Sequence, residues 1–471
     1  MYTSYYIVFI HQSVGHASLP SSQQLFVRHD REQACAGRNR LSDGVVEGWY
    51  DHHVRRRKTV ASTEDSASQA VGDRLMVAFG TLAILIVATL ASLFMAWTIG
   101  AGSSGSTPFA PAVGARAISV MRAGFLVGIL GLLGAILQGA NVADAVGTGL
   151  VGGLTLSPTA ATVLLLLAAG LVAVGIFTGY PIATAFTVTG AVVGVGLGLG
   201  GSPVWPKYAE IGTLWLLVPF VGGGIAYTTA RVLRHESIPE RYTIPALGAI
   251  IGLIVANIPF TLLGSGSSGA SVAAAATAEL PLPSAIGQAL VSLLVAVAAA
   301  GALVWDLDSD VERAERHFLL ALGGLVAFSA GGSQVGLAVG PLLAAVNGIA
   351  LPISISLFAL LVFGGIGLLA GSWMGAPRMI KAIAQDYSSL GPRRSIAALI
   401  PSFAIAQTAV VFGIPVSFNE IIVSAVVGSG FAAGGAGVST RKMANTVLAW
   451  IGSLALALAL GYGLITVIQL F

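Results

Sequence analysis

The chain has 471 residues, of which 55% are hydrophobic and only 9% are charged, and its formal net charge is +3. Soluble globular proteins carry about 25% charged residues, so we predict that most of this chain lies in lipid. The basic residues do not cluster on a soluble domain, which argues against a nucleic-acid partner. The single cysteine, Cys35, excludes an intrachain disulfide and a cysteine-based metal site. Five of the seven histidines precede residue 54, so we expect no metal site inside the membrane and no cofactor.

Residues 1–74 differ from the rest of the chain. They hold 9 of the 23 Lys and Arg residues and 8 of the 20 Asp and Glu residues, including a basic run at 55–58. We predict a polar, disordered tail, or residues translated upstream of the true start with Met76 as a candidate initiator. The first ten residues lack the basic region and the length of a signal peptide.

From residue 75 onward the chain is a series of apolar runs of about 20 residues, the length that crosses a bilayer core as a helix. This pattern predicts an all-α polytopic membrane protein, which we expect in the plasma membrane. The predicted helices number about twelve by this length criterion and cover 75–99, 117–138, 157–178, 182–200, 210–232, 244–263, 284–305, 318–330, 352–373, 395–413, 417–433 and 443–470.

Two stretches of the chain, Gly179–Gly201 and Gly413–Gly435, resemble each other when they are superposed residue by residue. Each opens with Gly-x-Pro and continues into an apolar helix that contains Ala-Val-Val-Gly-x-Gly. We interpret the match as an internal duplication, and we call the shift that places Gly179 on Gly413 the repeat offset. The predicted organisation is a first transmembrane repeat over 75–243, linking helices and loops over 244–317, and a second repeat over 318–471.

The charges of the loops predict how the repeats are oriented. Lys and Arg gather in four connections, around 231–241, 313–316, 378–394 and 441–442. With the predicted helices, all four connections lie on one face, which the positive-inside rule makes cytoplasmic. The two repeats then begin on opposite sides of the membrane and are inverted. The same arrangement places the basic run at 55–58 outside, against the rule.

Two further stretches, 100–116 and 331–346, are too rich in Gly, Ser and Pro for simple helices, and we predict that they break the helices before them. Broken helices at matching places in inverted halves indicate a transport site. Hydroxyl groups, an amide and the N–H groups of a half-helix suit an anion. The alternative is that these small residues only allow close helix packing.

The layout resembles the inorganic phosphate transporter (PiT) family of cation-coupled phosphate symporters. The segment 97–101 resembles the opening of its first GANDVANA-type motif, 329–342 resembles its second such motif, and 182–196 and 416–430 resemble its two PVSTTH helices. The motif aspartates are missing, because the Asn-Asp pairs of the family read Gly102-Ser103 and Ser333-Gln334. The resemblance implies two inverted repeats with broken or re-entrant helices.

It also implies secondary active transport of inorganic phosphate by symport with H⁺ or Na⁺ and alternating access, with the lipid bilayer as environment; a homodimer is compatible with it. The anion site that we predict contains Gly102, Ser103, Ser104, Ser106, Thr107, Thr184, Ser329, Gly332, Ser333, Gln334, Ser417 and Asn419.

Two carboxylates of the apolar region, Glu420 and Asp144, are candidates to carry the coupling ion, since intramembrane charges are usually functional. The absence of the motif aspartates favours H⁺ over Na⁺. Asp144 in an extramembrane loop and Glu420 at a helix mouth that faces water remain open alternatives.

Other functions remain open from the sequence. A permease for another oxyanion, such as sulfate, would use the same donors, and a channel would also need polar residues in the membrane. A membrane-embedded enzyme is a third alternative, although the sequence has no Gly-x-Ser-x-Gly motif and no cluster of catalytic side chains. The sequence has no phosphate-binding loop of the Gly-x-x-x-x-Gly-Lys-Ser/Thr type, which argues against ATP-driven transport.

The inverted arrangement predicts the accessibility of two loops. Single cysteines placed in the loops 233–243 and 378–394, in a Cys35→Ser background, should both react with an impermeant maleimide only from the cytoplasmic side. Labelling of either position from outside intact cells would contradict the predicted topology.

Overall fold

We describe the protein from a computed structural model. The structure describes residue 76 and residues 79–264, 269–281, 283–349, 355–387, 390–434 and 438–470. Contacts between residues divide the chain after Phe79, and the helical fold belongs to Gly80–Phe471. The predicted tail over 1–74 lies outside the described residues.

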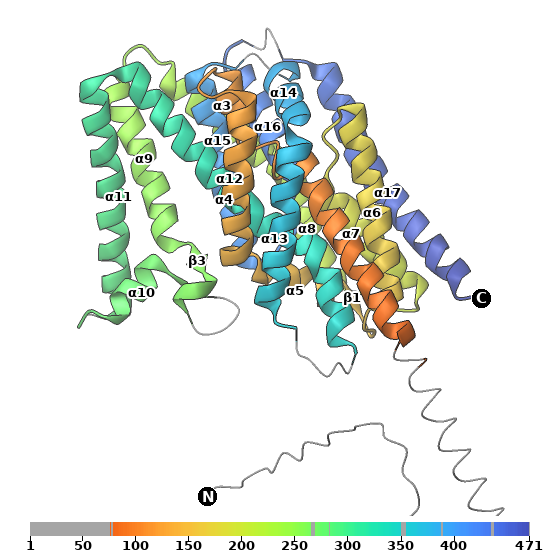
Figure 1. Ribbon diagram of the computed structural model, residues 1–471. Coiled ribbons are helices and arrows are strands. Elements are labelled where there is room, and N and C mark those ends of the chain that lie inside the picture. Colours follow the sequence, from red (N-terminus) through yellow and green to blue (C-terminus); the bar gives the residue numbers. More distant parts are fainter. Residues whose placement is uncertain are drawn as a thin grey trace, which may run out of the picture. The chain divides into compact units, whose positions relative to one another are not determined.

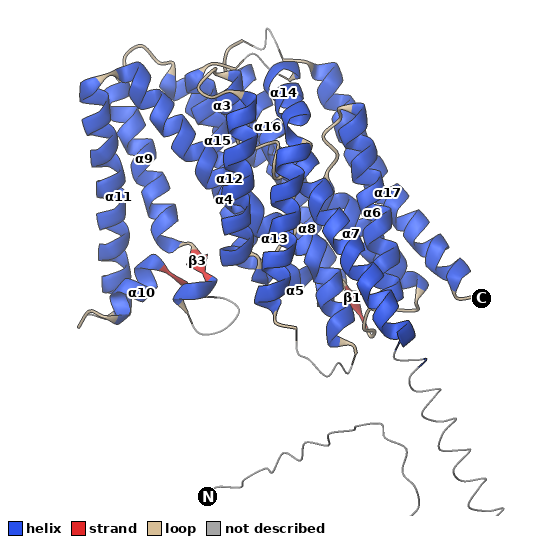
Figure 2. Cartoon of the chain, in the orientation of Figure 1, coloured by secondary structure: helices blue, strands red, loops and turns tan. Residues whose placement is uncertain are grey.

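The described part of the first repeat is helical almost throughout (Figures 1 and 2). A first span, Phe79–Gly102, is followed by turns and by the short helix α3. The elements that follow are α3 (Ala110–Gly114), α4 (Val120–Gln138), α5 (Ala140–Thr148), β1 (Val151–Gly152), α6 (Pro158–Thr178), α7 (Thr184–Gly198), β2 (Ser202–Pro203) and α8 (Trp205–Leu233). The two strands pair antiparallel, with Val151 opposite Pro203.

A helical pair separates the two repeats. α9 and α11 pack against each other and, together with the short helix α10, lie to one side of the remaining labelled helices in Figure 1. The elements of this segment are α9 (Glu240–Asn257), β3 (Pro259–Phe260), the 3₁₀ turn η1 (Thr261–Leu263), β4 (Ala270–Ser271), α10 (Val272–Ala278) and α11 (Ser284–Ser309). β3 and β4 pair antiparallel.

The second repeat follows the same order of helices as the first. Its elements are α12 (Val311–Asn347), α13 (Leu357–Met374), α14 (Ala376–Asp386), α15 (Pro392–Phe412), α16 (Phe418–Phe431) and α17 (Thr440–Ile468). Within the described residues, nine helices are long and apolar enough to cross a membrane, whereas α7 and α16 are shorter apolar helices. A helix is therefore present at each predicted position. Three of these helices, α7, α9 and α16, are not among the nine that are long and apolar enough to cross a membrane.

The duplication is visible in the backbone as well as in the sequence. α6 and α15 are 21 residues long and begin with Pro158 and Pro392, which correspond at the repeat offset. Both end at a glycine in the left-handed conformation, Gly179 with φ of 76° and Gly413 with φ of 60°. Gly200 and Gly434 form a second left-handed pair at the same offset. Left-handed backbone ends helices most easily at glycine, so the repeated glycines give both halves the same helix ends.

The two halves are inverted. The basic connections lie together on one face, because the Arg393 guanidinium pairs with Glu240 and lies 3.8 Å from Glu315. α15 therefore begins at this face. Its counterpart α6 ends there, since Lys442 at the start of α17 lies 5.6 Å from the ring of Tyr180. Equivalent helices thus run in opposite directions.

The first predicted helix break is confirmed and the second is wrong. The first span ends at Gly102, and turns cover 103–109. In the second repeat, α12 runs unbroken from Val311 to Asn347 with Pro341 inside it. Its glycines serve packing: a Cβ on Gly331 would lie 1.9 Å from the carbonyl oxygen of Gly131 on α4. The alternative of close helix packing therefore holds for the segment 331–346.

We expect Gly331→Ala to lower stability, because the added methyl group overlaps the backbone of α4. Overpacking of this kind typically costs about 1–3 kcal/mol, and a thermal melt in detergent would measure it as a lower Tm. Gly170→Ala is the matched control, since nothing lies within 4 Å of a Cβ at that position in α6. Equal Tm values for the two variants would contradict the packing role.

Candidate functional site

The short helices α7 and α16 begin inside the protein. In α7 every residue from Thr184 to Gly196 is buried, and in α16 every residue from Phe418 to Gly430. In the part of the chain that the structure describes, no side chain caps the first turn of either helix. The first backbone N–H groups of a helix have no partner within it, and a helix N-terminus favours negative charge. Two uncapped N-termini in a buried region form a favourable environment for an anion.

Gln334 connects the two repeats in front of these helix ends. Its Oε1 accepts hydrogen bonds from Thr184 Oγ1 at 2.7 Å and from Ser103 Oγ at 3.2 Å. Its Nε2 donates to the carbonyl oxygen of Val416, just before α16. The side chains of all three polar residues are fully buried. Gln334 lies within the continuous helix α12, so the helix ends in this region come from α7 and α16 and not from a break in α12.

Asn419 makes a second connection between the repeats. Its Nδ2 donates to the carbonyl oxygen of Ile182 at 2.6 Å and to that of Gly102 at 3.0 Å. Gly102 is the last residue of the first span, and Ile182 lies two residues before α7. The break after Gly102, the start of α7 and the start of α16 therefore meet at one place.

Four polar atoms on α12 and at the start of α16 are buried and have no hydrogen-bond partner among the described residues. They are Ser333 Oγ, Ser417 Oγ, Asn419 Oδ1 and Glu420 Oε2. Most buried polar groups in proteins are hydrogen-bonded, so a group of unpaired ones needs a reason. The two hydroxyl groups can donate to an oxyanion, and the amide oxygen can accept from a protonated ligand or a cation. All four atoms belong to residues that the sequence predicted for the site.

Other predicted residues lie at the first break and serve its geometry. Ser106 Oγ and Thr107 Oγ1 each donate to the carbonyl oxygen of Ser103 at 3.1 Å, and Ser104 Oγ lies 3.5 Å from the carbonyl oxygen of Ile99. These bonds close the turn that ends the first span. The hydroxyl groups of these three residues therefore support the position of Ser103.

Ser329 and Gly332 belong to a separate polar cluster that the sequence analysis missed. Gln138 on α4 and Gln407 on α15 exchange hydrogen bonds between their side-chain amides, and Gln407 Nε2 also donates to Ser329 Oγ. A Cβ on Gly332 would lie 2.7 Å from the Gln138 side chain. The sequence did contain a signal for this cluster, since Gln138 and Gln407 are uncharged amide side chains inside apolar helices.

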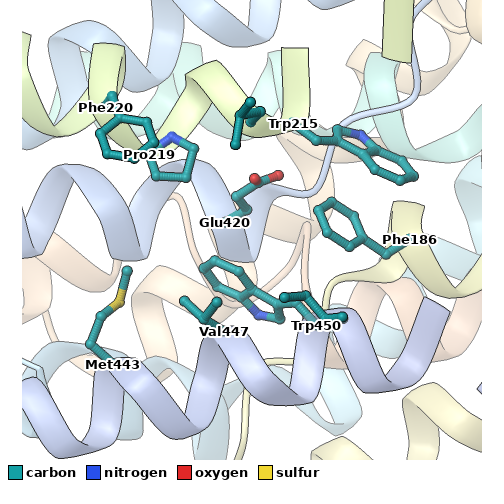
Figure 3. Close-up of a pocket in the computed structure, with 10 residues that line it drawn as sticks. Phe186, Trp215, Pro219, Phe220, Glu420, Met443, Val447 and Trp450 are labelled. Carbon is teal, nitrogen blue, oxygen red and sulfur yellow. The ribbon is translucent and has the colours of Figure 1, made fainter. Parts of the chain in front are cut away.

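Asp144 and Glu420 occupy different surroundings. Asp144 lies on α5 and is partly exposed. Glu420 is in the first turn of α16, only 1% exposed, and its carboxyl group lies among the aromatic rings of Phe186, Trp215 and Trp450 (Figure 3). Among the described residues no group of three or more His, Cys, Asp or Glu side chains could hold a metal ion.

Two tryptophans hold the loops that precede the short helices. Trp215 Nε1 on α8 donates to the carbonyl oxygen of Pro415 at 2.9 Å, and Trp450 Nε1 on α17 donates to that of Pro181 at 2.7 Å. Each bond joins a helix of one repeat to the loop of the other. Pro181 and Pro415 correspond at the repeat offset, and Trp215 and Trp450 are each the eleventh residue of their helices, so the two bonds are equivalent under the internal symmetry.

Comparisons with known proteins agree with this architecture. A model of the phosphate transporter family matches residues 99–461. A protein of Chlamydia pneumoniae described as a candidate phosphate permease is 25% identical over 404 residues, covering 78% of this chain and 94% of its own. The chloroplastic inorganic phosphate transporter 2-1 of Arabidopsis thaliana is 26% identical over 433 residues, covering 78% of this chain and 69% of its own. A solved structure of a sodium-dependent phosphate transporter has a similar fold, with a TM-score of 0.67 at 23% identity over 83% of this chain and all of that one.

Proposed function

Since the chain belongs to the phosphate transporter family, we propose that it is a secondary active transporter that moves inorganic phosphate by cation symport and alternating access. The family and the similar proteins are transporters, which sets aside the membrane-embedded enzyme. The protein is a multi-pass membrane protein. We propose the plasma membrane as its location and leave a homodimer open as its assembly.

The observation that carries the proposal is the buried polar cluster at the starts of α7 and α16. Ser333 and Ser417 provide unpaired hydroxyl groups, and Ser103 and Thr184 provide two more that Gln334 now occupies. Phosphate accepts many hydrogen bonds and is negatively charged, so it matches hydroxyl donors and the positive ends of two helices. We therefore propose that these four residues, with Gln334 and Asn419, bind the substrate.

The same cluster supplies a reason for alternating access. Ser103 and Thr184 belong to the first repeat, whereas Gln334 and Asn419 belong to the second, and all four side chains are fully buried. A substrate can reach them only if the repeats move apart on one side. The hydrogen bonds of Gln334 and Asn419 across the repeats would break and form again as the site opens to each side in turn.

For the coupling ion we propose H⁺ carried by Glu420, with Asp144 as the next candidate. None of the six proposed substrate-binding residues is a carboxylate, and sodium sites usually include hard oxygen ligands of that kind. Glu420 follows Asn419 directly, and an ionised carboxylate buried without a partner is strongly unfavourable. A proton that binds Glu420 as phosphate binds would remove both this penalty and the repulsion between the two negative charges. Such linkage between two ligands is what a symporter needs.

The proposed binding site predicts the effect of two substitutions. Gln334→Ala and Ser417→Ala should each raise the half-saturating phosphate concentration about tenfold to 150-fold, since a hydrogen bond to a charged ligand contributes about 1.5–3 kcal/mol. Uptake of radiolabelled phosphate into proteoliposomes measures this, and competition by sulfate tests the alternative oxyanion. Ser417→Ala should keep the parent Tm, because Ser417 Oγ has no partner to lose.

Ser429→Ala is the matched control on the same helix, since Ser429 Oγ bonds only within α16 at 3.0 Å. It should leave the half-saturating concentration unchanged. If Gln334→Ala and Ser417→Ala also leave it unchanged in correctly inserted protein, the phosphate site lies elsewhere.

The proposed proton coupling predicts a split between exchange and accumulation. Glu420→Gln mimics the protonated acid permanently, so the variant should still exchange phosphate across the membrane but no longer concentrate it under an imposed proton gradient. Counterflow and gradient-driven uptake in the same proteoliposomes measure the two activities, with a sodium gradient imposed separately. Accumulation at the parent level would remove Glu420 from the coupling mechanism, and Asp144→Asn would be examined next.

A further inference from the structure

A groove lies between the helices α8 and α17. α8 packs against α16, and α17 packs against α7, so the beginnings of the two short helices form the floor between them. A cavity of about 490 Å³ in this groove has an almost wholly apolar lining (Figure 3). At its edge Leu216, Phe220 and Ile451 are 67%, 72% and 57% exposed. In a chain that crosses a membrane, such apolar side chains face lipid, so the groove is open to the bilayer.

Of the residues that the structure describes, Glu420 is the one charged residue that lines this cavity. It is 1% exposed, and its Oε2 has no hydrogen-bond partner in the described part of the chain. Within the described ranges of the chain, no Lys, Arg or His lines the cavity to balance it. The carboxyl group therefore lies at the base of an apolar groove and can pair with a charge that comes from the bilayer.

The aromatic walls favour the same kind of charge. Phe186 and Trp215 stack with their ring centroids 3.9 Å apart, and Trp450 lies across the cavity from them (Figure 3). The indole N–H groups of both tryptophans already donate to Pro415 and Pro181. Phe186 covers one face of the Trp215 ring, but both tryptophan rings still line the cavity, and aromatic rings attract cations, especially quaternary ammonium groups.

A second cavity of about 460 Å³ adjoins the first, because Trp215 lines both. Its lining is also apolar and includes Trp205, Tyr208 and Leu458. Glu420 does not reach into this second cavity. The first cavity suits a cation beside Glu420, and the apolar linings of both cavities suit a hydrocarbon chain.

We propose that this groove binds a lipophilic ammonium, a single positive charge on an apolar tail, which enters from the bilayer and pairs with Glu420. A neutral lipid would leave the buried carboxyl group without a partner, and an anionic one would be repelled by it. A small inorganic cation would lack further side-chain oxygen ligands, since among the described residues that line the cavity only Glu420 carries a side-chain oxygen. Binding does not depend on the proposed transport mechanism. Inhibition of transport by the ligand rests on the coupling role proposed for Glu420.

The test uses the full chain in nanodiscs of phosphatidylcholine and dicyclohexylcarbodiimide, an apolar reagent for buried carboxyl groups. The carboxyl O–H adds across one C=N bond of the reagent and the adduct rearranges to an N-acylurea, so the protein gains the mass of the reagent and nothing leaves. Mass spectrometry should locate the adduct on Glu420. Dodecyltrimethylammonium should protect Glu420 at concentrations about tenfold or more below those of dodecanol, as expected for a contact with a charged group, and dodecanoate should not protect.

Matched variants complete the test. Glu420→Gln should lose the adduct, whereas Asp144→Asn should keep it together with the protection. Val447→Trp should fill the groove and lose both labelling and protection at an unchanged Tm. Absence of labelling at Glu420 in the parent would overturn the access from the bilayer, and equal protection by dodecanol and the ammonium would overturn the choice of ligand. None of these results requires phosphate transport, so this proposal and the proposed function can fail separately.

Discussion

Two short helices that start inside a membrane protein can exist only if the loops before them are held by other parts of the protein. Lipid cannot satisfy the hydrogen bonds of a non-helical backbone. Here Trp215 and Trp450 each donate to a proline carbonyl in such a loop, and Asn419 and Gln334 bind three further backbone carbonyls. All but the bond from Gln334 to Val416 join one repeat to the other, and Gln334 makes that connection through Ser103 and Thr184. The polar cluster, the helix ends that favour an anion, and the groove beside Glu420 all depend on this mutual support.

The symmetry of the backbone is not matched by symmetry of the chemistry. Glu420 and Phe186 occupy equivalent places in the first turns of α16 and α7, as the repeat offset requires. Gln334 occupies in the second motif the place that Ser103 occupies in the first, and the two side chains are joined by a hydrogen bond of 3.2 Å. The duplication thus provides two similar frames, while only the second repeat provides the amide and the carboxyl group. Because only one of the two equivalent positions carries a carboxyl group, the site can bind a single positive charge.

Glycine has two uses in this protein, and they look alike in the sequence. Around Gly102 the chain leaves the helix and turns, with Ser103 accepting the bonds that close the turn. Along α12 the glycines keep the helix intact and let α4 approach, as at Gly331 against Gly131. Both uses follow from the missing side chain, which permits unusual backbone conformations as well as close contact. Which of the two applies depends on whether a neighbouring helix lies against the glycine.

The sequence by itself determined most of the membrane-spanning helices, the duplication, its inversion and the family. These features depend on the length of apolar runs, on the charges of the loops and on the match between the two repeats. All three can be found in the sequence without knowing which helices are neighbours. Most of the residues that meet at the starts of α7 and α16 were also predictable, because hydroxyl and amide groups are rare in apolar helices. Only the tertiary structure decided that α12 is continuous, that Gln138 and Gln407 form a second cluster, and that Glu420 faces an apolar groove. These features depend on contacts between helices that are distant in the chain. The hydrophobicity of a segment does not show which of these helices will lie against it.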